Sequence, residues 1–172
     1  MRSISSIVFF RFIIIFLAQI IVFNNILIFG VSADIYIVFL LIFPQNINKS
    51  LYYFLIFLYG IFLDSFSNSF GIITFSLLIS AYLRPYILDF SFGNFDMRKV
   101  GKVRDYLINT TIYQKLTYIS IVIFSHTFIL YSIEIFSIYQ LELVFRNATI
   151  SSLISITLIL IVMTLFYYKN ER

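Results

Sequence analysis

The sequence predicts an all-α membrane protein with six transmembrane helices, some of them short. Its 172 residues are 61% hydrophobic and 12% charged, whereas a soluble domain has about 45–50% apolar and about 25% charged residues. Apolar runs recur along the chain with short polar turns between them. Nearly all Lys and Arg residues fall on one side of a six-crossing arrangement. We therefore expect one integral membrane domain over residues 1–172.

The first two predicted helices cover residues 7–29 and 31–46. The first is long enough to span a hydrocarbon core about 30 Å thick. Because Arg11 interrupts it and no small-residue cleavage site stands out, we expect an uncleaved helix instead of a signal peptide. Asp34 opens the apolar run of the second helix and is placed to cap it. This run is short for a span, so half of a re-entrant hairpin is the alternative interpretation.

The third and fourth predicted helices cover residues 51–66 and 70–88. The residues that typically end helices or form turns are more concentrated here than elsewhere in the chain. Asp64 ends one apolar run, a group of Ser and Asn residues follows, and Gly71 precedes the next run, which stops at Arg84 and Pro85. This pattern predicts a tight polar turn between two membrane helices. A carboxylate there is costly, since an ionised acid at the bilayer centre costs about 2.5–3.5 kcal/mol and less near the interface.

The fifth and sixth predicted helices cover residues 115–138 and 148–168. Before them lies the only long hydrophilic segment, 89–114, which contains Arg98, Lys99, Lys102 and Arg104. These basic residues either anchor the chain at anionic lipid headgroups, where each contributes on the order of 1 kcal/mol, or also form a docking surface for a cytoplasmic partner. With the amino terminus in the cytoplasm, only Arg146 of the 12 Lys and Arg residues falls outside. The basic loop and both termini are therefore predicted to be cytoplasmic.

Four ionisable residues are the candidates for a polar site within the membrane. The predicted topology places Asp34, Asp64 and Glu134 toward the outer side. His126 and Glu134 are eight residues apart and so share one helix face. Either these groups form an inward-facing cluster that binds a ligand or a partner, or the acids cap helix ends while His126 and Glu134 bond neighbouring helices. We favour the second interpretation because a carboxylate at a helix end commonly caps it.

The sequence contains no pattern that predicts an enzyme. It has one His and no Cys, which argues against a multi-histidine or thiolate metal site. It lacks a phosphate-binding glycine loop and an H-E-x-x-H motif. We therefore expect no catalytic residue, no cofactor and no metal, and the membrane context argues against nucleic acid.

Residues 60–71, GIFLDSFSNSFG, resemble the core of the rod shape-determining protein MreD family. They have its G-x-x-x-D-x-x-S pattern, built on Gly60 and Asp64, with Gly71 following. Residues 81–85, AYLRP, resemble the Bacteroidetes branch of that family near the end of the next helix. Asp34, His126 and Glu134 also resemble polar positions of the family.

This resemblance implies a non-enzymatic component of the bacterial cell-elongation complex in the inner membrane. Its implied partners are a single-pass MreC-like protein, an MreB-like actin homologue and the glycosyltransferase–transpeptidase pair that builds lateral wall. The implied fold is similar to the six-helix substrate-binding component of energy-coupling vitamin transporters. A small-molecule-binding or transport subunit is therefore the alternative function.

Overall fold

The computed structural model of the chain describes residues 13–43, 48–93 and 111–168, with side chains described as far as Ile161. This part is mainly helical. A short apolar helix, Ile13–Asn25, ends in the 3-10 turn η1 (Phe23–Asn25). The elements that follow are β1 (Leu27–Ile28), β2 (Val31–Ser32), α2 (Ile37–Ile42), α3 (Lys49–Ser67), α4 (Ile72–Phe92), α6 (Ile112–Ile135), η2 (Ile138–Gln140) and α7 (Leu141–Tyr168).

Four helices in the described ranges are long and apolar enough to cross a membrane. They are α3, α4, α6 and the stretch Ile138–Ile161, which includes most of α7. The prediction of a mainly helical membrane protein is confirmed at this level. The predicted spans 51–66 and 70–88 correspond to α3 and α4, and 115–138 corresponds to α6.

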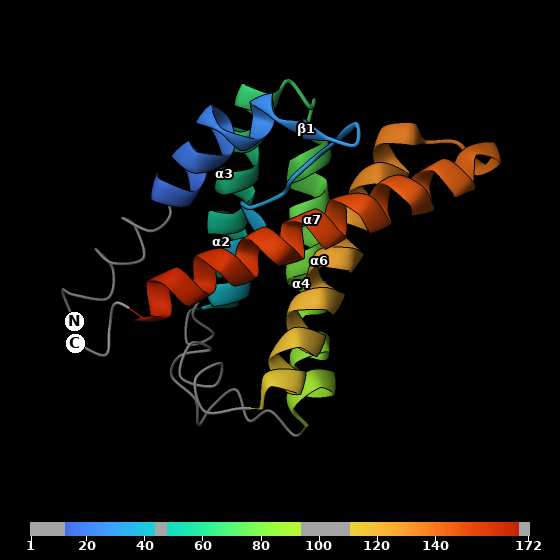
Figure 1. Cartoon of the computed structure of the whole chain (residues 1–172). Helices are drawn as coiled ribbons and strands as arrows, with labels where there is room; N and C mark the ends of the chain where they lie inside the picture. The colour runs from blue at the N-terminus through green and yellow to red at the C-terminus, as the bar shows by residue number, and fades with distance from the viewer. Residues whose placement is uncertain (1–12, 44–47, 94–110, 169–172) are drawn as a thin grey trace.

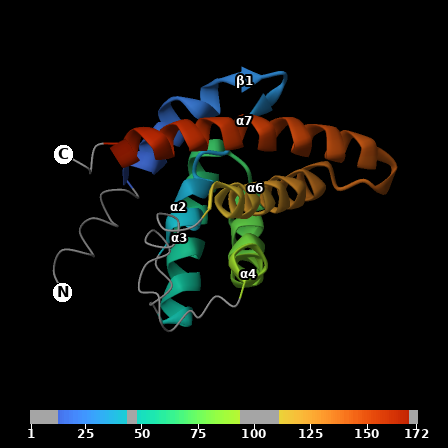
Figure 2. The same ribbon diagram turned by 60° about the horizontal axis from the view of Figure 1, so that its bottom comes forward.

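The long helices pack in chain order, α3 against α4, α4 against α6 and α6 against α7. Figures 1 and 2 show α7 lying obliquely across the other elements, with the amino-terminal helix beside α3. Aromatic contacts join that helix to α3, because the ring of Phe16 lies 6.4 Å from that of Tyr59 and 5.6 Å from that of Phe66. Short α2 lies inside this arrangement, and residues 35–41 are all buried.

The predicted helix over residues 31–46 is wrong in its extent. Phe29 and Gly30, with φ of +54° and +82°, form a turn that pairs β1 with β2. Only six residues, Ile37–Ile42, are helical, and they extend about 9 Å. α2 ends because Phe43 precedes a proline and adopts an extended conformation, with ψ of 134°. Residues 44–47 lie outside the described part.

The first predicted helix, 7–29, also ends earlier than expected. Its residues 7–12 lie outside the described part, and its helix stops at Asn25. The side chain of Asn25 donates a hydrogen bond of 3.1 Å to the carbonyl of Ile21. Such side-chain bonds compete with the helical backbone pattern and favour termination.

The expected stop at Arg84 and Pro85 is wrong. Pro85 lies inside α4, which continues to Phe92 and ends at Gly93, where φ is +61°. Proline costs a helix one backbone hydrogen bond, but the buried side chains on both sides of Pro85 keep α4 continuous. The hydrophilic segment 89–114 is therefore helical at both borders, while residues 94–110, which include the four basic residues, lie outside the described part.

The last helix begins earlier than predicted. α7 starts at Leu141 instead of residue 148, so Glu142 and Arg146 lie on its first turns and not in a loop. α6 begins at Ile112 because Thr111 and Gln114 form a capping box. The start of α6 thus depends on polar residues that hydropathy alone assigns to a loop.

Candidate functional site

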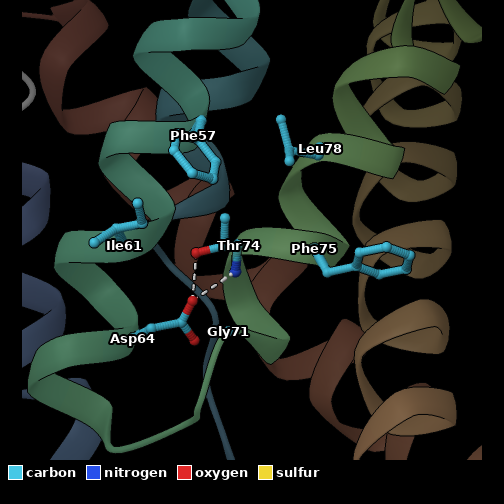
Figure 3. A pocket seen from close by; sticks show the side chains of 7 residues that line it. All are labelled: Phe57, Ile61, Asp64, Gly71, Thr74, Phe75 and Leu78. Carbon is cyan, nitrogen blue, oxygen red and sulfur yellow. Dashed lines mark hydrogen bonds between the residues drawn. The ribbon is translucent and has the colours of Figure 1, made fainter.

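The turn between α3 and α4 is held by Asp64. One carboxylate oxygen accepts from the backbone N–H of Ile73 at 3.0 Å, and the other accepts from the N–H of Thr74 at 2.9 Å. The hydroxyls of Ser69 and Thr74 donate to the same carboxylate. Figure 3 shows both bonds from Thr74. Asp64 therefore caps the amino end of α4 from the neighbouring helix, as the capping interpretation predicts.

The glycines beside Asp64 have separate roles in this turn. Gly71 precedes α4 with φ of +92°, a left-handed conformation that favours glycine, and it has no side chain to cap α4 itself. Gly60 lies against α4, where a Cβ atom would come within 2.6 Å of the Cα of Thr74. A small residue at this point lets two membrane helices approach closely. The predicted Gly60, Asp64 and Gly71 thus act together in the α3–α4 contact.

An apolar groove of about 410 Å³ opens between α3 and α4 beside this turn (Figure 3). Its lining residues are Phe57, Ile61, Asp64, Gly71, Thr74, Phe75 and Leu78. Phe57, Ile61 and Phe75 are exposed. Both carboxylate oxygens of Asp64, in contrast, already accept the four hydrogen bonds just described. The groove is therefore apolar in its chemistry even though a carboxylate borders it.

Asp34 does not cap α2. Its carboxylate accepts from the hydroxyl of Ser151 at 3.2 Å, and its backbone N–H donates to the hydroxyl of Ser155 at 2.9 Å. The prediction of Asp34 as an N-cap is therefore wrong, because the side chain turns toward α7.

Gln19 bonds the turn that leads into α2 instead. Its side-chain oxygen accepts from the N–H groups of Ile35 at 2.9 Å and Tyr36 at 3.2 Å. Its amide nitrogen donates to the carbonyl of Ala33 at 3.1 Å. The sequence offered one signal for this role, a lone glutamine within an apolar run, which favours a polar partner in the protein interior.

His126 is fully buried and joins three elements. Its Nε2 lies 2.8 Å from the hydroxyl of Tyr36, and its Nδ1 lies 3.1 Å from the hydroxyl of Ser80. Ser80 donates its hydrogen to the carbonyl of Ser76 at 2.7 Å, so it accepts from Nδ1–H, and Nε2 accepts from Tyr36. Both ring nitrogens are satisfied in the neutral form, which fits the interpretation of His126 as a residue that bonds neighbouring helices.

The predicted outer polar cluster is divided into separate networks. Asp34 is bonded to α7, Asp64 to α4, and His126 to α2 and α4. Glu134 is exposed near the end of α6, and no hydrogen bond to another described residue is found for it. The arrangement therefore uses most of its buried polar groups to connect helices.

Arg84 is a buried structural residue whose place the sequence did not predict. Its side chain is fully buried and not at a cytoplasmic helix end. The guanidinium donates to the carbonyls of Leu41 at 3.1 Å and Phe43 at 2.7 Å, and to the hydroxyl of Tyr118 at 3.0 Å. Carbonyls at a helix end lack helical partners and carry partial negative charge. Arg84 thus stabilises the carboxyl end of α2.

This arrangement can hold helices together and present surfaces for binding. The described part of the chain contains no group of three His, Cys, Asp or Glu residues that could bind a metal ion. The basic residues Arg98, Lys99, Lys102 and Arg104 lie outside the described ranges, so their two interpretations stay as predicted. No protein-family model, curated protein or solved structure matches this chain.

Proposed function

We propose that this chain is a non-enzymatic scaffold of the bacterial cell-elongation complex, with the role that its resemblance to MreD implies. It would lie in the inner membrane with both termini in the cytoplasm. Four candidate spans are present, and the amino-terminal helix with the segment that ends in α2 would complete six crossings. We also propose that the arrangement of its helices is similar to that of the substrate-binding component of energy-coupling vitamin transporters.

The apolar groove beside Asp64 is the observation that carries this proposal. Three of its seven lining residues, Ile61, Asp64 and Gly71, belong to the segment 60–71 that resembles the family. Its exposed apolar side chains are those of Phe57, Ile61 and Phe75. Helices associate in a membrane by close packing more than by the hydrophobic effect, since lipid chains are as apolar as the side chains. A groove between two closely packed helices supports recognition of a third apolar helix. The single-pass MreC-like protein is the proposed partner that would supply such a helix.

The other proposed partners meet the cytoplasmic side. The basic residues of 94–110 would contact anionic lipid headgroups and the MreB-like actin homologue. The glycosyltransferase–transpeptidase pair would join through the membrane domain. A scaffold of this kind acts through binding alone, which agrees with buried polar groups that bond one another.

Co-purification tests the proposal directly. A tagged chain extracted in mild detergent should retain a single-pass membrane protein with a domain outside the cytoplasm. Ile61→Trp fills the groove and should reduce the recovered partner several-fold, whereas Leu153→Trp, on the exposed face of α7, should not. Stoichiometric retention of a vitamin-like molecule without such a partner would favour the transport subunit instead.

Reporter fusions test the topology. Fusions after Lys102 and after Arg172 should both report the cytoplasm, because the six-crossing arrangement places the basic loop and the tail on one side. One cytoplasmic and one external reporter would refute six crossings.

A further inference from the structure

Three phenylalanines occupy backbone conformations that usually exclude them. Phe29, Phe70 and Phe136 have φ of +54°, +51° and +41°. Glycine or asparagine normally takes such positions, and strain of this kind costs on the order of 1–3 kcal/mol for each residue. The three side chains gain no burial in return, because they are 87%, 98% and 88% exposed. Within the folded chain alone, these rings therefore make no buried contact that would offset the backbone strain.

The three residues lie at turns on the same end of the molecule. Phe29 is in the turn between β1 and β2, Phe70 is in the α3–α4 turn, and Phe136 follows α6. Figure 1 shows all three turns in the upper part of the view, with the turn after α6 to the right of the other two. The side-chain nitrogen of Asn24, in η1 just before β1, donates to the hydroxyl of Ser67 at the end of α3 at 2.8 Å, which joins the segments next to the first two turns.

The turns carry no charge. Residues 26–33, 68–71 and 136–140 contain no Asp, Glu, Lys or Arg. Two neighbours of Phe136 in the last turn, Ile138 and Tyr139, are also almost fully exposed. The nearest exposed charges are Glu134 on α6 and the pair Glu142 and Arg146 on α7. A turn that projects into water is normally polar, whereas exposed aromatic and aliphatic side chains are typical of the membrane interface.

We infer that these turns insert into the boundary between lipid headgroups and acyl chains at one face of the membrane. The occupant of the surface is lipid, because the apolar turns are continuous with the exposed apolar faces of the spanning helices. Burial of apolar side chains at this boundary is favourable in proportion to their buried area. Transfer of three rings from water into the interface offsets the backbone strain.

Tryptophan fluorescence tests the inference, because the chain contains no Trp. Single variants Phe70→Trp and Phe136→Trp are reconstituted into phosphatidylcholine–phosphatidylglycerol vesicles. Lipids brominated near the top of the acyl chain should quench both strongly, and iodide should quench each several-fold less than it quenches N-acetyltryptophanamide. Leu153→Trp, in the middle of a candidate span, should instead be quenched best by deeply brominated lipid.

The opposite pattern would overturn the inference. Iodide quenching as strong as that of the free indole, without quenching by brominated lipid, would place the turns in water. Tyr139→Trp keeps the test decisive if a strained position does not tolerate Trp, because Tyr139 lies in the same turn and has no left-handed backbone. Its fluorescence must show the same interfacial quenching.

Discussion

Removal of the Asp64 side chain should separate its capping role from recognition. Asp64→Ala leaves the N–H groups of Ile73 and Thr74 without their acceptor, together with the hydroxyls of Ser69 and Thr74. Loss of a helix cap costs about 0.5–2 kcal/mol, and each buried donor left unsatisfied costs about 1–3 kcal/mol. Since water or lipid headgroups replace part of this bonding, we expect a loss of about 2–4 kcal/mol.

The free energy of unfolding can be measured by SDS titration in mixed micelles, with circular dichroism as the signal. Asp64→Asn keeps one acceptor oxygen, so its free energy of unfolding should fall by about half as much as that of Asp64→Ala. Asp89→Ala is the matched control, because Asp89 lies exposed on α4, and it should change stability by no more than about 0.5 kcal/mol. If Asp64→Ala unfolds like the unmodified chain and yet fails to retain a partner, the capping argument is refuted and recognition is its role.

Two further predictions use the same titration. Gly60→Ala should cost about 1–3 kcal/mol by overpacking, since the added Cβ would lie 2.6 Å from Thr74 Cα; unchanged stability would contradict the close contact. Arg84→Lys should lower the free energy of unfolding by about 1–3 kcal/mol, because one ammonium cannot reach all three acceptors of the guanidinium. An equally stable variant would show that the three bonds of the guanidinium are not needed for stability.

The α3–α4 unit was predictable from the sequence because its signals are local. Asp64 and Gly71 mark a turn, and the apolar runs on either side have the length of a span. The expected limits of 51–66 lie within a few residues of α3. Which oxygen of Asp64 meets which amide was not predictable, since the partners Ile73 and Thr74 belong to the next helix.

The segment that ends in α2 was not predictable in the same way. Hydropathy measures how apolar a segment is, but it does not distinguish a segment surrounded by lipid from one surrounded by protein. Residues 35–41 are buried by protein, and the residues that satisfy the ends of α2 are distant in sequence. Arg84 is more than forty positions from Leu41. A charge rule that places every Arg at a cytoplasmic end could not identify this contact.

The buried polar residues share one physical purpose, and this bears on how the chain can act. At membrane depth, backbone that is not in a long helix persists only where protein groups satisfy it. Gln19 supplies acceptors at the start of α2, and Arg84 supplies donors at its end. Asp34 and His126 connect the same segment to α7, α4 and α6. Because these groups are committed to the fold, the proposed recognition would use the exposed surfaces. The groove beside Asp64 is such a surface, and Ile61, Asp64 and Gly71 from the segment that resembles the family help to line it.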